Sequence, residues 1–365
     1  MRIEPFGLER WLSENESSCK YNLAKASPPP FTFQEVFGRI DPNLRLGYGT
    51  TQGSIALRKK ISQLYEGVDE KNVLVTTGTA EADYLVANAI LRGGEEVIVP
   101  VPSYRHIVGV AKAHGCKILQ PEMKESDSYD LDLDSVSRLV SPKTKLIWVT
   151  NPNNPTGTKL KTDHVKGLCE IAKDVNAYLV FDEALKGLEL DGIESPSPVG
   201  MYDKAVCTRS LTKIGFAGLR IGWIVGNREL IQEAWAYKDY TTLSHSAIGE
   251  LLAEQMPEKK EMIKIYERSR SLLRERLSIL TKWMDQHRNV FSYVPPKAGA
   301  SAFPGYIFEE DSVEFCRSLL KAEGVLLSPG DFFGGPKHFR IYYGQDPALL
   351  GEALDKLDLF MKRHA

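Results

Sequence analysis

The chain has 365 residues, which is enough for two domains, and its 42% hydrophobic and 26% charged residues are ordinary for a soluble globular protein. Its formal net charge of -2 lacks the basic excess that binding to nucleic acid or to an anionic membrane requires. The five cysteines form no Cys-x-x-Cys pair, so neither a disulfide framework nor a metal site is expected, and a reducing cytoplasm is the simplest location. The first twelve residues do not resemble a signal peptide, and no run approaches the roughly 18 apolar residues of a membrane span.

The middle of the chain alternates short apolar segments with longer segments of helical spacing. The apolar segments, each expected to form a strand, are Val73–Thr76, Glu96–Val99, Leu146–Thr150, Ala177–Phe181, Ala205–Thr208 and Ile221–Val225. Helical patterns such as Glu81–Leu91 and His164–Lys173 lie between them. This alternation predicts crossover connections and a mostly parallel sheet, and strands that are apolar on both faces predict helices on both sides of it.

The pattern changes in the last third of the chain. A long charged, amphipathic helix is expected at 258–286, followed by turn signals and shorter elements. We therefore expect a large α/β domain at residues 31–255 and a smaller α+β domain at 256–365. The first 30 residues end in a stiff Pro28-Pro-Pro30 run, and we expect them to pack on the small domain or to cover a site, as a lid that excludes water.

One segment carries a concentrated chemical signal, Ser210-Leu-Thr-Lys213-Ile-Gly-Phe-Ala-Gly-Leu-Arg220. Hydroxyls with an arginine indicate a phosphate site, because a guanidinium offers phosphate a fixed fork of donors. A lysine beside them is a candidate for a Schiff base with an aldehyde. Pyridoxal phosphate (PLP) carries both groups. Taken alone, Lys213 is more simply interpreted as an exposed loop lysine, so the assignment depends on the rest of the chain.

Two further motifs follow predicted strands, where ligands bind in open α/β sheets. Gly78-Thr79-Ala80 opens a helix, whose free amides and dipole favour a phosphate, although for this motif alone an ordinary helix cap by Thr79 is the better interpretation. Asp182 ends a buried strand, where a carboxylate needs a partner such as a protonated pyridine ring. The alternative for Asp182 is a turn or helix-capping aspartate.

Three more residues complete the set. The stiff turn Asn151-Pro-Asn-Asn154-Pro-Thr-Gly157 can hold the Asn154 amide against the phenolic oxygen of the cofactor. Tyr104, in Pro102-Ser-Tyr104, can stack on the pyridine ring, although a core tyrosine is the simpler interpretation. Arg340 interrupts an apolar strand and needs an anion, either a substrate carboxylate or an internal acid.

Together these motifs resemble the fold type I PLP-dependent enzymes and, within them, the class I/II aminotransferases that include aspartate aminotransferase. The resemblance covers most of the chain and also includes Tyr48-Gly49-x-x-x-Gly53 and Asp182-Glu-Ala184. It implies a mostly parallel seven-stranded sheet flanked by helices, which forms the PLP-binding large domain, and a smaller α+β domain built from both chain ends. It also implies a homodimer with shared active sites.

The resemblance assigns a role to each candidate. Lys213 would carry PLP as an imine and shuttle the proton, and Asp182 would hold the pyridinium. Asn154 would bind the phenolic oxygen and contribute to substrate binding, and Tyr104 would stack on the ring. Arg340 would bind the substrate carboxylate. The phosphate would be bound by Gly78, Thr79, Ala80, Ser210, Thr212 and Arg220, and by Tyr48 of the other subunit.

The resemblance implies transfer of the amino group of an α-amino acid to a 2-oxo acid. The alternative on the same scaffold is a PLP-dependent lyase or a cyclising synthase of the capreomycidine type, to which Phe6-Gly-Leu-Glu-Arg-Trp11-Leu is somewhat similar. A PLP-binding regulator without activity is a third interpretation. We expect Phe6, Trp11 and Tyr240 to shape the substrate pocket, which would suit neutral or aromatic side chains.

The chain departs from the family pattern at two places. Leu185 stands where the family has a tyrosine that donates to the phenolic oxygen of the cofactor, and the span from Lys213 to Arg220 is one residue shorter than usual. Because of this shorter span, the assignment of Arg220 as a phosphate ligand is weaker than the assignment of Lys213 as the Schiff-base residue.

The Leu185 departure gives a first prediction. Removal of a donor to an anionic oxygen favours protonation, so the Lys213–PLP imine is expected to stay protonated to higher pH than in a Leu185→Tyr variant. Titration of the visible absorbance of both proteins measures this. Identical titration curves would contradict it.

Overall fold

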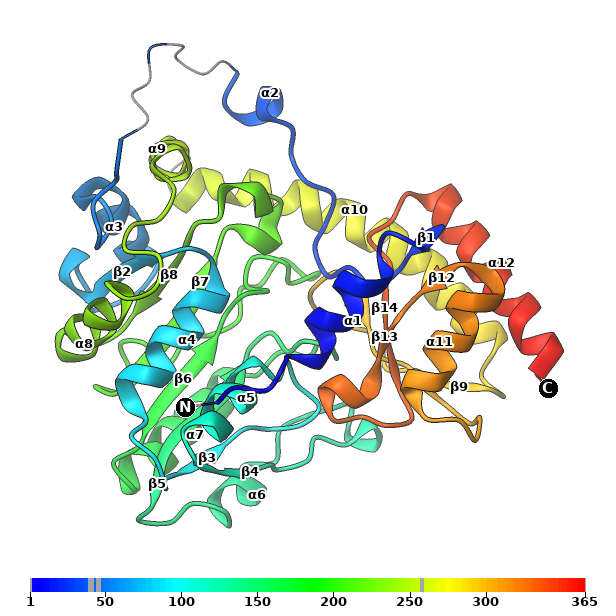
Figure 1. The fold of residues 1–365 in the computed structure, drawn as a ribbon, viewed down its shortest axis with the longest axis horizontal. Helices are drawn as coiled ribbons and strands as arrows, with labels where there is room; N and C mark the ends of the chain where they lie inside the picture. The colour runs from blue at the N-terminus through cyan, green and yellow to red at the C-terminus, as the bar shows by residue number, and fades with distance from the viewer. Residues whose placement is uncertain (1, 39–42, 44–46, 257–258, 365) are drawn as a thin grey trace.

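The computed structural model describes residues 2–38, 43, 47–256 and 259–364. Its larger part is built on a sheet of seven strands within these residues, in the order β2-β8-β7-β6-β5-β3-β4 (Figure 1). The strands are β2 (Val73–Thr76), β3 (Glu96–Ile98), β4 (Lys117–Leu119), β5 (Thr144–Thr150), β6 (Tyr178–Asp182), β7 (Ala205–Ser210) and β8 (Gly222–Val225). Only β8 runs antiparallel to its neighbours, which confirms the mostly parallel sheet.

The six strands expected from the sequence are all present, and β4 was missed. This edge strand has only three residues, and its side chains are exposed or half-buried. Its sequence, Lys117-Ile-Leu119, therefore lacks the continuous apolar signal of the central strands, which are buried on both faces. β7 extends two residues beyond the expected segment, to Ser210. The Ser210 hydroxyl therefore lies at the end of the strand, on the edge of the sheet.

Helices cover both faces of the sheet, as expected. One face packs against α4 (Thr79–Ile90), α5 (His106–Ala113) and α8 (Arg228–Lys238) through a buried apolar cluster that includes Leu85 and Trp148. The other face is covered in part by α3 (Ile55–Ser62), α6 (Leu133–Ser137) and α7 (Thr162–Asp174), with α9 (Ala247–Glu254) beside α3. The apolar cluster on this second face continues without a break into the smaller part of the molecule.

Both chain ends contribute to the smaller part (Figure 1). Its strands form a three-stranded antiparallel sheet of β10 (Ser301–Ala302), β14 (Phe339–Tyr342) and β13 (Ser328–Pro329), and the pairs β9 (Phe291–Ser292) with β11 (Gly305–Tyr306) and β1 (Tyr21–Asn22) with β12 (Val325–Leu326). Its helices are α10 (Lys259–Gln286), α11 (Ser312–Glu323) and α12 (Pro347–His364). The short α2 (Phe33–Val36) lies on the connection between the two parts.

The first helix, α1 (Gly7–Asn15), is fixed to the smaller part. Leu8 and Trp11 are buried, and the Trp11 indole N–H donates to the carbonyl of Leu327 at 2.8 Å. The helix therefore lies beside β13 and spans the gap toward the sheet (Figure 1). In the described part of the chain, no helix combines the length and apolarity needed to cross a bilayer.

Candidate active site

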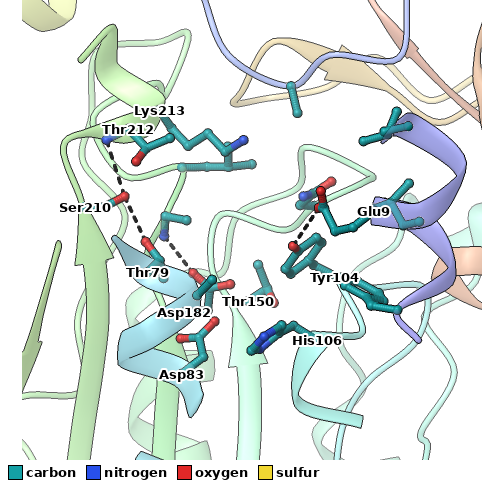
Figure 2. Close-up of a pocket in the computed structure, with 18 of the residues that line it drawn as sticks. Glu9, Thr79, Asp83, Tyr104, His106, Thr150, Asp182, Ser210, Thr212 and Lys213 are labelled. Atoms are coloured by element: carbon teal, nitrogen blue, oxygen red, sulfur yellow. Dashed lines mark hydrogen bonds between the residues drawn. The ribbon is translucent and has the colours of Figure 1, made fainter. Parts of the chain in front are cut away.

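A cavity of about 600 Å³ lies where the carboxyl ends of β5, β6 and β7 meet α1 and the smaller part (Figure 2). Ten of the twelve residues predicted from the sequence line it, namely Thr79, Ala80, Tyr104, Asn154, Asp182, Ser210, Thr212, Lys213, Arg220 and Arg340. They come from segments that are up to 261 positions apart in sequence, between Thr79 and Arg340. Parallel pairing explains their meeting, because the ends of parallel strands share one edge of the sheet.

Hydroxyls and a free helix end gather in one corner of the cavity. The Thr79 hydroxyl donates to Ser210 Oγ at 2.8 Å, and the Thr212 backbone N–H lies 3.3 Å from the same oxygen. α4 begins here, directly after Gly78, which has a φ of 81° and no side chain to cap the first amides. These unpaired amides and the positive end of the helix dipole suit an anion. The corner therefore has the donor set of a phosphate site.

Arg220 closes this corner. Its Nη2 donates to the carbonyl of Thr77 at 3.3 Å, and a Cβ atom on Gly78 would lie 2.6 Å from the same nitrogen, so only glycine permits this approach. Arg220 itself has a left-handed backbone, with a φ of 53°, at the end of a short 3-10 turn. The tight turn compensates for the short span after Lys213, and the guanidinium still reaches the cavity.

Lys213 lies above Asp182 in the cavity, with its ammonium group free of hydrogen bonds to the described residues (Figure 2). Burial lowers its pKa to about 8, and the nearby charge of Arg340 acts in the same direction, while Glu9 and Asp182 oppose both. A lysine with this pKa is about half neutral at pH 8 and still has a neutral fraction at neutral pH. It is therefore available as a nucleophile or a base.

Asp182 is buried at the end of β6, where its Oδ1 accepts the Ala184 backbone N–H at 2.9 Å. Burial raises its pKa to about 6, so the charge has no adequate partner within the protein. This carboxylate faces the cavity beneath Lys213 (Figure 2). It is placed to pair with a cationic ring nitrogen of a bound molecule.

A second acid, Asp83, lies directly below Asp182 and was not predicted (Figure 2). It accepts the Thr208 hydroxyl at 2.6 Å, and Thr208 is the register partner of Asp182 on the neighbouring strand. Burial, and then the charge of Asp182, raise the pKa of Asp83 well above its ordinary value. The sequence did contain an indication of this acid, because Asp83 is a charged residue among the apolar residues of the buried face of α4.

Arg340 is buried on β14 and has no ion pair among the described residues. Its Nη1 donates to Asn154 Oδ1 at 3.1 Å, and its Nη2 donates to the carbonyl of Ala24 at 2.7 Å. Burial lowers its pKa to about 10. An internal salt bridge, which was the alternative interpretation of Arg340, is therefore not found in this part of the chain. The guanidinium remains available for an anion in the cavity.

The N-terminal segment forms the wall opposite Lys213. Phe6 packs edge-on against Tyr104 with ring centroids 5.2 Å apart, and the Tyr104 hydroxyl donates to Glu9 Oε1 at 3.1 Å. Glu9 was not predicted from the sequence. A single acid in a short amphipathic helix looks like a solvated residue until the helix is placed in space.

Two of the residues expected at the substrate pocket lie elsewhere. Trp11 is turned toward Leu327, and Tyr240 is 91% exposed, so the expectation of an aromatic pocket is wrong for Trp11 and Tyr240 in this chain. Tyr48 is also 91% exposed and does not line the cavity of its own chain. Leu185 does line it, buried beside Asp182, and offers no hydrogen-bond donor.

Comparison with known proteins agrees with this geometry. Residues 15–357 match the family model described as "Aminotransferase class I and II". The chain belongs to this family. The family identifies PLP as the cofactor of this chain, and the anion corner, the buried Asp182 and the depressed pKa of Lys213 fit its phosphate, ring nitrogen and aldehyde.

Individual relatives include both aminotransferases and a cyclase. A PLP-dependent aminotransferase from Streptococcus suis 89-1591, whose crystal structure is known, has 31% sequence identity to this chain. The two structures have a TM-score of 0.90 over 100% of this chain and 99% of that one. The chain is 28% identical to a capreomycidine synthase of Streptomyces vinaceus, over 92% of this chain and 88% of the relative. The structure of the PLP-dependent cyclase OrfR is also 28% identical, with a TM-score of 0.88 over 100% of this chain and 99% of that one.

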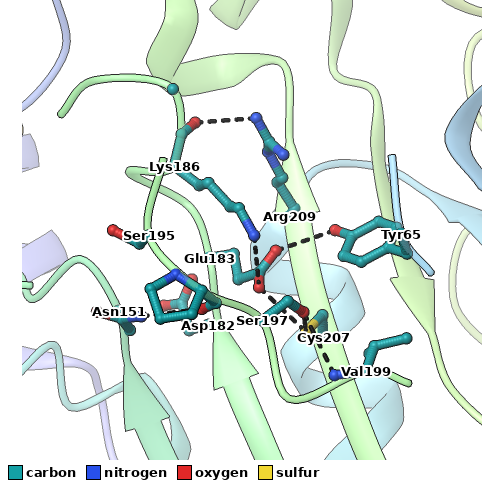
Figure 3. Close-up of polar contacts among 12 residues, drawn as sticks. Tyr65, Asn151, Asp182, Glu183, Lys186, Ser195, Ser197, Val199, Cys207 and Arg209 are labelled. Atoms are coloured by element: carbon teal, nitrogen blue, oxygen red, sulfur yellow. Dashed lines mark hydrogen bonds and ion pairs between the residues drawn. The ribbon is translucent and has the colours of Figure 1, made fainter. Parts of the chain in front are cut away.

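A second buried polar cluster lies behind Asp182, on the side of β6 away from the cavity (Figure 3). Glu183 Oε1 is 3.2 Å from Lys186 Nζ, and Glu183 Oε2 accepts the Tyr65 hydroxyl at 3.1 Å. The Cys207 thiol also donates to Glu183, at 3.3 Å. The neighbouring Arg209 donates to the carbonyl of Lys186 at 3.1 Å. Because Glu183 is wholly buried and fully partnered, it fixes the strand end that carries Asp182.

The Glu183 cluster predicts a large stability effect. Glu183→Gln removes the charge that compensates Lys186 and is expected to cost about 3 kcal/mol of unfolding free energy, as for other broken buried pairs. Urea unfolding of the PLP-free protein measures this loss. Glu233→Gln, which removes the exposed ion pair with Arg92, is the control and is expected to cost less than about 1 kcal/mol. Equal losses would contradict the assigned role of the cluster.

The raised pKa of Asp182 predicts opposite effects on stability and on cofactor binding. The folded-state pKa of about 6 lies above that of the unfolded chain, so the charged carboxylate destabilises the PLP-free protein as pH rises through 6. Asp182→Asn is therefore expected to stabilise this protein at pH 8, by up to about 3 kcal/mol, and to have a smaller effect at pH 4.5. The same variant is expected to bind PLP at least tenfold more weakly. Thermal unfolding at both pH values and PLP titration test the two effects, and a stability difference independent of pH would contradict the first.

Proposed function

We propose that this protein is an aminotransferase that moves the amino group of an α-amino acid to a 2-oxo acid. The observation that carries the proposal is the placement of Arg340, a buried cation without an ion partner among the described residues, in the same cavity as Lys213. Arg340 supplies a fork for an α-carboxylate, and Lys213 supplies an amine at the place where the substrate Cα would lie. Both substrates of the reaction carry this carboxylate next to the reacting carbon.

The residues divide the work as follows. Thr79, Ser210, Thr212 and Arg220, with the amides of α4 at Gly78 and Ala80, hold the cofactor phosphate. Asp182 keeps the proton on the ring nitrogen, Asn154 binds the phenolic oxygen, and Tyr104 packs on the ring face.

Bound PLP would serve as an electron sink, which would make the Cα–H proton of the substrate acidic. Lys213 Nζ would accept this proton from the substrate Cα and deliver it to the cofactor carbon next to the substrate nitrogen. Its pKa of about 8 suits both directions near neutral pH, because the free base and the ammonium form are both populated. Arg340 holds the carboxylate, which orients the Cα–H bond toward Lys213.

A homodimer belongs to the same proposal. Tyr48 is exposed together with Ile55 at the start of α3 and Ile248 on α9. Gly49, next to Tyr48, lies close to α9, so these residues share one side of the larger part. A second copy covering this side would bury them and place Tyr48 at the cofactor phosphate of its neighbour.

The second candidate is a PLP-dependent lyase or cyclising synthase. It is favoured by the similarity to a capreomycidine synthase and to the cyclase OrfR, and by Leu185 in the cavity. The same residues would hold the cofactor and take the Cα proton. The reaction would then end in elimination or ring closure and would release no 2-oxo acid.

A half-reaction screen tests the proposal. The PLP-loaded protein is mixed with single amino acids without an oxo acid, and the visible cofactor band and the released products are measured. An aminotransferase is expected to lose the band and release one equivalent of 2-oxo acid per site, and light scattering is expected to give the mass of two chains. Ammonia or a ring-closed product without loss of the cofactor's aldehyde form would favour the second candidate. A Lys213→Ala variant, which lacks the proton-transferring amine, is expected to be at least a thousandfold slower.

A further inference from the structure

α1 carries a carboxylate into the substrate end of the cavity. Leu8 and Trp11 fix one side of the helix in the apolar interior, and Glu9 projects from another side toward Tyr104 (Figure 2). Glu9 is exposed to the water of the cavity, and its one hydrogen bond within the described part of the chain comes from the Tyr104 hydroxyl. It lies within electrostatic reach of Lys213 and Arg340, because its charge opposes the lowering of their pKa values by burial.

The charges around the cavity leave Glu9 without a partner once cofactor and substrate are bound. Under the proposed function, Arg220 faces the phosphate, Asp182 faces the ring nitrogen and Arg340 faces the α-carboxylate. Lys213 alternates between the Schiff base and a free amine that carries the substrate proton, so it offers Glu9 no lasting charge. Lys25 and His106 also line the cavity, yet neither forms an ion pair with Glu9 within the described residues. Burial lowers the pKa of His106, although the charge of Glu9 opposes this, so its ring is neutral at neutral pH. Asp83 is buried below Asp182 and bound to Thr208, outside the reach of a substrate side chain.

Substrate binding makes this lone carboxylate selective. In the open cavity, water solvates Glu9 at little cost. An amino acid that fills the space between α1 and the ring displaces that water, and an uncompensated carboxylate in a dry site is costly. A neutral side chain leaves this cost in place, and an acidic one increases it by repulsion. A side chain that ends in a cation replaces the lost hydration with a charge-assisted hydrogen bond.

We propose that Glu9 selects amino acids whose side chain ends in a cation, a guanidinium or an ammonium group. This inference rests on the proposed function, because it assumes that Arg340 holds the α-carboxylate and that the cofactor occupies the cavity floor. It replaces the neutral or aromatic specificity expected from the sequence. The Tyr104 hydroxyl acts as a positioning group, since it fixes one carboxylate oxygen and leaves the other for the substrate.

Isosteric pairs of amino acids test the inference. L-Arginine and L-citrulline differ in the charged guanidinium, and L-lysine and L-2-aminoheptanoic acid differ in the ammonium group. Each is titrated into the PLP-loaded protein, and apparent dissociation constants are taken from the change in the visible band and from the shift of the thermal midpoint. We expect the cation to bind at least tenfold more tightly than its neutral isostere in one pair or both.

Three variants assign the effect to Glu9. Glu9→Gln keeps the shape and is expected to bring the ratio within each pair close to one, mainly by weakening the cationic ligand. Glu14→Gln removes an exposed acid from the same helix, away from the cavity, and is expected to leave the ratio unchanged. Glu9→Asp, which retains the charge on a shorter side chain, is expected to recover part of the ratio.

The outcomes separate the two proposals. If no amino acid changes the band, the proposed function fails and the inference fails with it. If amino acids change the band, but neutral isosteres bind as well as the cations in the wild-type protein, the inference alone is overturned. The inference is also overturned if Glu9→Gln keeps the preference, because the cation would then be recognised by another group.

Discussion

The parallel pairing of β5, β6 and β7 is the constraint on which the site depends. Thr150 pairs with Asp182, and Asp182 pairs with Thr208, so the three strand ends are held level with one another. The Asn154 turn, Asp182 and Ser210 therefore reach one edge of the sheet together, although they are far apart in sequence. Each of these strands is buried, and the apolar packing of its two faces fixes the position of its polar end.

The two neighbouring acids at the end of β6 show how differently a buried charge can be treated. Glu183 points to one side of the strand and is satisfied by Lys186, Tyr65 and Cys207 (Figure 3). Asp182 points to the other side, where it has one backbone donor and a raised pKa. Glu183 therefore stabilises the fold, whereas the Asp182 carboxylate lacks a charged partner and is left to pair with a ligand. Adjacent positions can serve both purposes because successive side chains of a strand point to opposite faces.

The sequence predicted the sheet, its buried strands and ten residues of the cavity, because each of these has a local signal. Buried strands are continuous apolar runs, and ligand residues follow them at turns rich in Gly, Pro and Asn. β4 has no such signal, since a short edge strand is half exposed. Glu9 and Asp83 were missed for another reason, because their meaning comes from where a helix is placed rather than from the residues around them. Trp11 was misassigned on the same ground, since an aromatic residue in a covering helix can face either side.

The bond between the Trp11 indole and the carbonyl of Leu327 joins α1 to the smaller part of the molecule. Glu9 is therefore attached to the smaller part through α1, while Asp182 and the anion corner belong to the sheet. Any rotation of one part against the other changes the gap between Glu9 and the cofactor floor, and it moves Arg340 in the same sense because β14 lies in the smaller part. The two groups that we propose to bind the substrate therefore belong to the same part of the molecule, so they would approach the α-carboxylate and the side chain together.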